Sequence, residues 1–487
     1  MKVLLDTNIL IPAEPLSGPE LNKNTKRVVA LLKAVSGQGH DLLLHPSVRN
    51  DLNSDRDENR KQTRLILLKK YKILKDPPSV AQQLRRRLGP PGRRSNDHVD
   101  DVLIGAVYEN AVDILVSEDD GVHKKAQRAG LHDRVVTLDE AIRMFRALSP
   151  KESDRPPPAV RHIMCYEIDP NDPIFKSFRE DYPDFDLWLA KCSTQKRDAW
   201  VVFDDIGKYA GICIVKPETG GERSLGGIVL KICSFKVVDI GRGLSELLLK
   251  TVFDFIHQEG FDHTYVEVFP KHAGLIRFLE NFGFYPQRNR TEKGEIVLVK
   301  DFVCSPEEYK RINALEYNIK YGPNNLKIES ARFFIVPVKS VYHKLLFPDV
   351  EHQLSLLPGR NAFGNAIRKA YLCRSPTKDL PSGSILLFYR SGDEKAVRCI
   401  GIVEKTLRSD EANEIIRFVG PRTVYTTDEI VAFSRKSTLG ILFRYVHPLA
   451  TPLSFGELRS HEIIEGPPRS IVQIGDRGVK WLSRLIK

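Results

Sequence analysis

The sequence contains few cysteines and no long apolar run. Its seven cysteines are spread over 487 residues, and none belongs to a Cys-x-x-Cys pair. This spacing argues against a disulfide framework and a structural zinc site, so we expect reduced and mostly buried thiols. No run approaches the roughly 18 apolar residues that cross a bilayer, and Asp6 interrupts the apolar start before it could become a signal-peptide core. We therefore expect a cytoplasmic protein with no membrane partner.

Acidic residues are fewer than basic residues in this chain. Lysine and arginine number 74 against 63 for aspartate and glutamate, which gives a formal net charge of +11. Such a balance favours a polyanionic partner, RNA or DNA. Hydrophobic residues make up 41% and charged residues 28%, as in ordinary globular proteins, which excludes a wholly disordered or collagen-like chain. At about 100–200 residues per domain, the length predicts two to four domains.

Two changes in composition divide the chain. Residues 149–158, SPKESDRPPP, are too rich in proline for a helix or a central strand. A softer break follows a helix-like stretch, SPEEYKRINALEYN, before a region rich in strand-forming residues opens at residue 332. We therefore predict domains at residues 1–148, 161–303 and 329–487, joined by a linker at 149–160 and a connecting segment at 304–328.

Aspartates recur at the ends of the elements predicted for the first domain. They are Asp6 after the strand 2–5, Asp51 in the helix after the strand 41–45, Asp97 and Asp101 at the start of an apolar helix, and Asp119 after the strand 112–116. The i, i+4 spacing of Asp97 and Asp101 places both on one helix face. Acids at the carboxyl ends of parallel strands would gather around a hard divalent cation. The alternative is that each is a helix cap or a first-turn acid.

At these positions the sequence resembles a known family. The segments LLDTNIL, HPSVRNDL, NDHVDDVLIGA and ILVSEDDGV follow one another as in the PIN domain, a metal-dependent ribonuclease fold. The resemblance covers residues 1–147 and implies a parallel α/β sheet with bound Mg²⁺ or Mn²⁺. By position it implies Asp6, Asp51, Asp101 and Asp119 as catalytic metal ligands, Asp97 and Asp120 as accessory ligands, and Ser117 and Asn8 as hydrogen-bonding support. Asp51 departs from the family, which more often has the longer Glu.

The resemblance to the PIN domain suggests a protein partner, and the nearby arginines suggest RNA. PIN-like toxins often have an antitoxin, so an antitoxin or a second copy of the chain is a candidate partner. A basic segment, Arg85, Arg86, Arg87, Arg93 and Arg94, flanks a Gly-Pro-Pro-Gly turn just before the third acidic group. These arginines are placed to hold RNA phosphates near the acids. A solvated basic loop is the alternative.

The second domain is predicted to contain strands at 199–203, 209–215 and 227–238. The last of these leads into DIGRGLS at 239–245, a glycine turn that runs directly into an apolar helix. Consecutive backbone N–H groups at such a helix start suit an anionic pyrophosphate. A further strand at 263–269 and the segment LIRFLENFGF complete the pattern.

This order of elements resembles the GNAT acetyltransferase family over residues 161–303. The resemblance implies acetyl-CoA as cofactor and acetyl transfer to an amine. It implies cofactor binding by Val237, Val238, Gly241, Arg242, Gly243, Leu244 and Ser245. The chain departs from the family at Ile240, where Arg or Gln is usual, at Ser245, where Gly or Ala is usual, and at Leu279, where a tyrosine often serves as general acid. Glu267 and His272 lie where a base would act, with an ordinary surface acid and loop histidine as the alternative.

The third domain is predicted to be rich in strands, at 332–338, 383–389, 396–403 and 440–446, and to end in a helix. Its segments GSILLFYRSG and GPPRSI resemble the PUA-like superfamily of EVE and ASCH domains, which implies a β-barrel that binds RNA or modified bases. Arg360, Arg368 and Lys369 lie among aromatic residues, a mixture that suits base stacking and phosphate contact. A helix with a basic outer face is the alternative.

The predicted fold class is therefore multidomain α/β and α+β, with a parallel sheet, a mixed sheet with helices, and a β-barrel. The first functional hypothesis is a toxin-type, metal-dependent ribonuclease coupled to an acetyl-CoA-binding domain and an RNA-binding module. The second is an N-acetyltransferase that acts on an amine of a protein or of an RNA such as tRNA. The third is a non-catalytic RNA-binding regulator. The first domain keeps every acidic position while the second has lost several family residues, so the sequence ranks the nuclease first.

Overall fold

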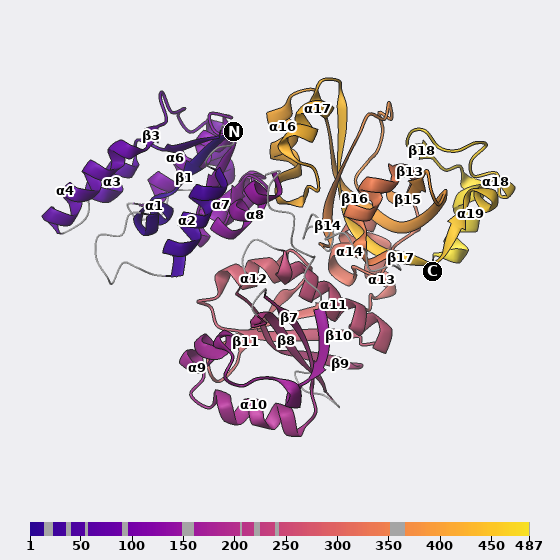
Figure 1. Ribbon diagram of the computed structural model, residues 1–487, viewed down its shortest axis with the longest axis horizontal. Coiled ribbons are helices and arrows are strands. Elements are labelled where there is room, and N and C mark those ends of the chain that lie inside the picture. The colour runs from indigo at the N-terminus through magenta and orange to yellow at the C-terminus, as the bar shows by residue number, and fades with distance from the viewer. Residues whose placement is uncertain are drawn as a thin grey trace. The chain divides into compact units, whose positions relative to one another are not determined.

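The described chain forms two compact units. The computed structural model describes residues 1–13, 23–35, 40–53, 57–89, 96–148, 160–204, 207–218, 225–238, 243–350 and 366–486. One unit comprises Met1–Lys151 and Ser409–Arg435, and the other comprises Glu152–Arg408 and Lys436–Lys487 (Figure 1). The predicted linker at 149–160 lies almost entirely outside the described residues. The finer division into three domains stays a prediction.

The first unit is built on a five-stranded sheet in the order β3-β2-β1-β4-β5, and every pair of neighbours is parallel. Its strands are β1 (Lys2–Leu5), β2 (Asp41–Leu44), β3 (Lys72–Ile73), β4 (Ile114–Val116) and β5 (Val135–Val136). Its helices are α1 (Thr7–Ala13), α2 (Lys23–Val35), α3 (Val48–Asn53), α4 (Glu58–Leu67), η2 (Leu68–Lys70), α5 (Gln82–Leu88), α6 (Asn96–Tyr108), α7 (Asp120–Ala129) and α8 (Leu138–Leu148). The prediction of a parallel α/β sheet here is confirmed.

A parallel sheet places the carboxyl ends of its strands at one edge. In β1, the residues Val3, Leu4 and Leu5 are buried because the strand is central and both of its faces are covered. Leu5 is in register with Leu44 of β2 and Val116 of β4. The residues that follow these three strands therefore meet at the same edge.

A helical insertion from the third predicted domain belongs to the first unit. It lies between β16 (Ala396–Ser409) and β17 (Thr438–Ser454) and contains α16 (Ala412–Val419), η8 (Gly420–Arg422) and α17 (Thr427–Ser434). Arg417 pairs with Asp113, Arg422 pairs with Asp133 at 2.7 Å, and the Thr427 hydroxyl donates to the Leu148 carbonyl at 2.9 Å. The sequence did not indicate this association, because the contacts join segments almost 300 residues apart.

Replacing Arg417 with Met will destabilise the first unit by about 2 kcal/mol. Asp113 is 8% exposed, and besides Arg417 its carboxylate accepts from the backbone N–H of Lys2 at 2.7 Å, so the variant leaves a buried carboxylate short of one donor. Hydrogen exchange of peptides from β4 and α8 measures the loss. Arg435→Met, at an exposed position of the same insertion, is the matched control and should leave protection unchanged. Equal protection in the two variants would contradict the prediction.

The second unit contains a seven-stranded mixed sheet in the order β11-β12-β10-β9-β8-β7-β6. Its strands are β6 (Val160–Met164), β7 (Asp198–Phe203), β8 (Tyr209–Glu218), β9 (Val229–Val237), β10 (His263–Val268), β11 (Tyr285–Arg290) and β12 (Ile296–Asp301). Its helices are η3 (Cys165–Glu167), η4 (Pro173–Phe175), α9 (Lys176–Asp181), α10 (Phe185–Thr194), α11 (Leu244–Glu259), α12 (Ala273–Glu280), α13 (Pro306–Arg311) and α14 (Ala314–Tyr321). Side chains of α11 and α12 pack on one face, and those of η4 and α10 on the other. The prediction of a mixed sheet with helices is confirmed.

The same unit carries a second mixed sheet in the order β14-β17-β16-β15-β13-β18. Its other elements are β13 (Phe333–Lys339), α15 (Ser340–Leu346), η6 (Pro348–Val350), β14 (Arg368–Cys373), β15 (Ile385–Ser391), α18 (Phe455–Ser460), β18 (Val472–Gln473) and α19 (Asp476–Leu485). The predicted β-barrel is wrong for the described residues. The edge strands β14 and β18 do not pair with each other, and β18 is only two residues long, so the sheet stays open.

Two further expectations concern cysteines and membranes. All seven cysteines are free thiols, as predicted, and four of them are buried. Within the described ranges, no helix combines the length and apolar character needed to cross a bilayer.

Candidate functional sites

The predicted acids of the first unit gather at the carboxyl edge of its sheet. The Asp6 carboxylate accepts hydrogen bonds from the Ser117 hydroxyl at 2.6 Å and from the Asn8 amide at 2.8 Å. Asp51, from α3, accepts from the hydroxyl of Thr7 at 2.7 Å. Burial raises the pKa of Asp6, and the negative charges of Asp119 and Asp51 add to the rise. These three carboxylates are therefore close enough to repel one another.

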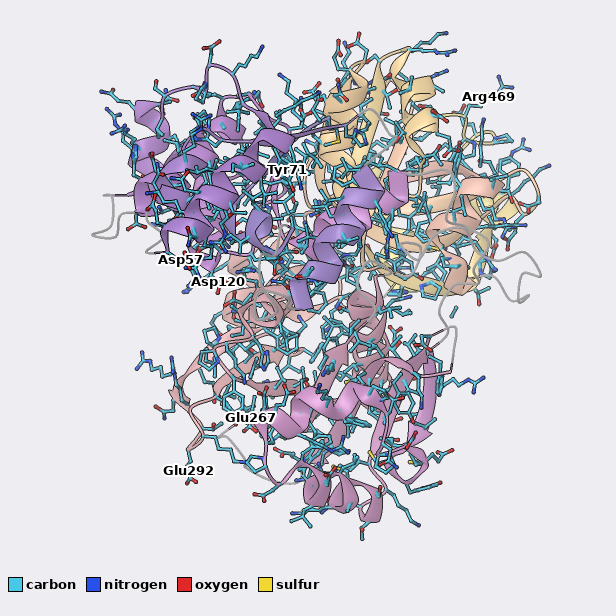
Figure 2. The ribbon with its side chains drawn as sticks, turned by 60° about the vertical axis from the view of Figure 1, so that its left-hand side comes forward. Asp57, Tyr71, Asp120, Glu267, Glu292 and Arg469 are labelled. Atoms are coloured by element: carbon cyan, nitrogen blue, oxygen red, sulfur yellow. The ribbon has the colours of Figure 1, made fainter. Side chains whose placement is uncertain are left out.

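Asp119 has a second role at this edge. Its carboxylate caps α7 by accepting from the backbone N–H groups of Gly121 and Val122 at 2.6 and 3.2 Å. The Asp119 side chain therefore acts as a helix cap, which was the alternative interpretation of these acids. Asp120, which Figure 2 labels, is the first residue of α7 and is half-buried.

Sequence reasoning missed two members of this cluster, Asp100 and Lys125. Burial raises the pKa of Asp100 to about 6, although Lys125 acts against the rise, and the charges of Asp119 and Asp6 increase it further. Asp100 therefore faces the cluster alongside the predicted Asp101. Lys125 could have been found, because the buried positions of α7 are Val122, Lys125, Ala126 and Ala129, which places a lysine in an apolar stripe.

The residues of this edge do not fit a divalent metal ion as they are arranged. Among the described residues, no group of three or more His, Cys, Asp or Glu side chains is placed to hold one. The Lys125 ammonium instead pairs with Asp97, Asp100 and Asp101, at 3.3, 3.2 and 2.9 Å. The predicted Mg²⁺ or Mn²⁺ site is therefore not supported by the geometry.

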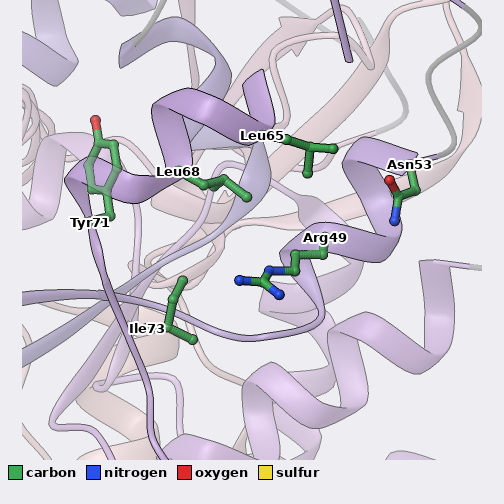
Figure 3. A pocket seen from close by; sticks show the side chains of 6 residues that line it. All are labelled: Arg49, Asn53, Leu65, Leu68, Tyr71 and Ile73. Atoms are coloured by element: carbon green, nitrogen blue, oxygen red, sulfur yellow. The ribbon is translucent and has the colours of Figure 1, made fainter. Parts of the chain in front are cut away.

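The predicted basic segment is described only in part. Arg85, Arg86 and Arg87 lie on α5 with exposed side chains, whereas Arg93 and Arg94 lie outside the described residues. A cavity of about 380 Å³ lies elsewhere in this unit, between α3 and the segment from α4 to β3 (Figure 3). It is lined by Arg49, Asn53, Leu65, Leu68, Tyr71 and Ile73. None of the predicted acids lines it.

In the second unit, two parallel strands part at the predicted cofactor site. The pairing of β9 with β10 runs from Val229 and His263 to Ile232 and Val266. Beyond that point β9 continues to Val237 alongside β8, and β10 continues to Val268 alongside β12. The described parts of the two strands therefore diverge at their carboxyl ends. In sheets of parallel strands, ligands bind at the carboxyl ends of the strands.

The helix α11 begins at this opening. Gly243 caps its start with φ +67°, a left-handed conformation that favours glycine, and Leu244 is its first residue. The first amides of a helix have no partner within the helix, so they suit a pyrophosphate. Gly241 and Arg242 lie outside the described residues, and the Val238 amide is already bonded to the Ala210 carbonyl at 2.8 Å. Gly243, Leu244 and Ser245 thus remain the described candidates for the cofactor phosphates.

Glu267 lies directly beyond the last paired residue of β10, at the start of the opening. Its carboxylate accepts from the Lys231 ammonium of β9 at 2.7 Å, and the side chain is 16% exposed. Figure 2 labels Glu267. The Lys231 ammonium lies 5.3 Å from the centre of the Tyr265 ring, and the Tyr265 hydroxyl donates to Glu218 at 2.9 Å. The residues of these three strands form a polar row on the sheet face opposite α11.

Tyr182 is a further member of this site that the sequence did not indicate. It lies between α9 and α10, its ring packs 5.3 Å from Phe269, and its hydroxyl donates to Glu295 at 2.6 Å. Burial raises the pKa of Tyr182, and the carboxylates of Glu295, Asp181 and Glu267 raise it further, so the hydroxyl keeps its proton. The residue at the family's usual tyrosine position, Leu279, is buried in the core beside α11 and offers no proton.

The structure places His272 and the predicted RNA-contacting residues of the third domain in surroundings that differ from the predicted ones. His272 is exposed before α12 and pairs with Asp181 at 3.1 Å. Arg368 pairs with Glu404 at 2.8 Å, and Lys369 is 1% exposed, with its ammonium over the rings of Phe347 and Tyr445. Since Arg368 and Lys369 belong to the mostly buried edge strand β14 and not to a basic helix surface, they do not form an open cationic face. Arg360 lies outside the described residues.

Comparisons with known proteins give partial likenesses. No protein-family model matches the chain, and no curated protein matches it. Among solved structures, ASCH from Zymomonas mobilis is similar with 12% identity and a TM-score of 0.25, over 31% of this chain and 94% of that one. An acetyltransferase of the GNAT family from Staphylococcus aureus Mu50 is similar with 14% identity and a TM-score of 0.23, over 29% of this chain and 99% of that one. The NatC complex bound to Gag peptide and CoA is similar with 15% identity and a TM-score of 0.22, over 30% and 99%. The likeness to the PIN domain stays a prediction from sequence motifs.

Proposed function

We propose that this protein is an acetyl-CoA-dependent N-acetyltransferase whose site is the opening between β9 and β10. The observation that carries the proposal is the parting of these strands beyond Ile232 and Val266, with Glu267 at the start of the opening. A helix start capped by Gly243 lies at the same opening and supplies amides for the cofactor phosphates. The residues therefore fit acetyl-CoA, which would supply an acetyl thioester open to attack by an amine.

One side chain of the site has the chemistry that the acceptor amine needs. An amine must lose a proton as its nitrogen bonds to the acetyl carbon, and the Glu267 carboxylate is placed to take that proton. Lys231 orients Glu267. The sulfur must gain a proton as its bond to carbon breaks, and solvent supplies it, because burial and the surrounding carboxylates raise the pKa of the Tyr182 hydroxyl and make it a poor acid. Solvent then removes the proton from Glu267.

The acceptor class follows from charge. The chain carries a formal net charge of +11, and the exposed arginines of α5 and β11 belong to this excess. A basic protein attracts polyanions over long range. We therefore favour an amine attached to RNA over an amine of a protein as the acceptor.

RNA cleavage at the acidic edge, the first hypothesis from sequence, has less support. The gathering of Asp6, Asp51 and Asp119 favours it. The ion pairs of Lys125 with three neighbouring acids oppose it, because they occupy carboxylates that the mechanism needs for metal.

The test of the proposed function is transfer of a labelled acetyl group by the purified full chain. Label from acetyl-CoA should appear in an aminoacylated-tRNA pool and, more weakly or not at all, in a pool of peptides with free amines. Free CoA should be released in equal amount. Failure to bind acetyl-CoA, with no label in either pool, would contradict the proposal.

Replacing Gly243 with Val will weaken acetyl-CoA binding at least tenfold, because a branched side chain at φ +67° distorts the start of α11. Gly260→Val is the matched control. Gly260 caps the other end of the same helix with φ +72°, and a side chain there would meet nothing within 4 Å. The control should lose similar stability yet bind acetyl-CoA as wild type does in calorimetry. Equal affinity in the two variants would place the cofactor elsewhere.

A further inference from the structure

Lys125 of α7 lies beside the acids at the start of α6. The residue is 9% exposed, although it belongs to a helix with an otherwise apolar buried stripe. Lysine is rarely buried to this degree without partners, because an ammonium loses its hydration on burial. The polar partners of Lys125 therefore explain why this lysine is buried.

The ammonium makes two hydrogen bonds and two further ion-pair contacts. It donates to the backbone carbonyl of Asp97 at 2.9 Å and to Oδ2 of Asp100 at 3.2 Å. Its nitrogen also lies 2.9 Å from Oδ1 of Asp101 and 3.3 Å from Oδ1 of Asp97, although Oδ1 of Asp101 accepts no hydrogen bond. The charge of the ammonium therefore faces three carboxylates at once.

The same oxygens are the ones that a divalent cation would need. Asp97 and Asp101 are acids that the sequence motifs assign to a metal, and Asp100 faces Asp119 and Asp6 across the cluster. A positive charge fixed beside Asp97, Asp100 and Asp101 repels a second cation that would use the same carboxylates. Removing the ammonium would leave three carboxylates without their common partner.

We propose that Lys125 is the resident cation of this acidic cluster and that it closes the cluster to divalent metal ions. The first unit then keeps Asp97, Asp100 and Asp101 around a fixed ammonium, and metal-dependent hydrolysis is not its activity. The proposal is independent of acetyl transfer in the second unit, since the two concern different sheets.

Mn²⁺ binding to the full-length protein tests the proposal. Wild type should bind no Mn²⁺ at concentrations up to about 0.1 mM in calorimetry, which lies below the range where weak carboxylate sites fill (about 10⁻⁴–10⁻³ M). Lys125→Met should bind Mn²⁺ at least tenfold more tightly than wild type, and Mn²⁺ should raise its melting temperature. Lys125→Arg, which keeps the charge, should behave as wild type. Adding Asp101→Asn to Lys125→Met should remove the gained affinity, because that carboxylate is one of the freed ligands.

The exposed neighbour Lys124 provides the matched control, and Lys124→Met should not change Mn²⁺ binding. Wild type that binds Mn²⁺ as tightly as Lys125→Met would overturn the proposal, as would folded Lys125→Met that binds none. Tight Mn²⁺ binding by wild type would overturn the proposal without any variant, so the proposal stays testable if Lys125→Met does not fold. Asp76, an exposed aspartate of the same unit, is a control for charge removal. Mn²⁺-dependent cleavage of total RNA by wild type, lost in Asp6→Asn and kept in Asp76→Asn, would also overturn the proposal.

Discussion

Replacing Glu267 with Gln will lower the rate of acetyl transfer about 100-fold or more and leave acetyl-CoA binding unchanged. The amide cannot take the proton that the acceptor amine must lose, but it keeps the size of the side chain beside Lys231. Because Glu267 lies on the polar face of the sheet and we propose the start of α11 as the site of the cofactor phosphates, the substitution separates chemistry from cofactor binding. Single-turnover transfer from labelled acetyl-CoA gives the rate, and calorimetry gives the affinity.

Glu292→Gln is the matched control for this experiment. Glu292 is exposed between β11 and β12, and both residues are labelled in Figure 2. The control should transfer acetyl groups at the wild-type rate. If Glu267→Gln also keeps the wild-type rate, Glu267 is not the base. A rate that falls equally in Glu267→Gln and Glu292→Gln would point to a general loss of charge as the cause.

Replacing Gly283 with Ala will destabilise the second unit by about 3 kcal/mol or more. Gly283 has φ +87°, and a side-chain carbon there would lie 2.1 Å from the backbone carbonyl oxygen of Ile319 and 3.0 Å from the Lys300 ammonium. That carbonyl accepts from Lys300 at 3.1 Å, and burial lowers the pKa of Lys300 well below its usual range. A methyl group must therefore displace both the end of α14 and a buried lysine.

Gly294→Ala separates the two contributions to this effect. Gly294 also has a left-handed conformation, with φ +81°, but a side chain there would meet nothing within 4 Å. Its substitution should lower the free energy of unfolding by about 1–2 kcal/mol, which is the cost of the left-handed backbone conformation alone. Urea unfolding followed by tryptophan fluorescence measures both variants, because all three tryptophans belong to the second unit. Equal losses would mean that the close approach of α14 contributes nothing.

The sequence alone determined the type and order of most elements. Short apolar runs bounded by polar residues predicted β1, β2 and β4, and the repeating apolar pattern after the glycine turn predicted α11. It also placed Asp6, Asp51 and Asp119 at one edge, because the carboxyl ends of parallel strands meet. These features depend on local spacing, which a sequence displays directly.

Only the tertiary structure decided what these residues contact. Lys125 follows Asp101 by more than twenty residues. Its place in the apolar stripe of α7 marks it as a buried lysine, but its own segment does not show which acids its ammonium contacts. Tyr182 and Glu295 are more than 100 residues apart, yet they form one hydrogen-bonded pair beside Glu267. The insertion 409–435 joins the first unit through Arg417. Each of these pairings depends on long-range packing, in which a side chain's chemistry is set by partners that are distant in the chain, so no local pattern could have predicted them.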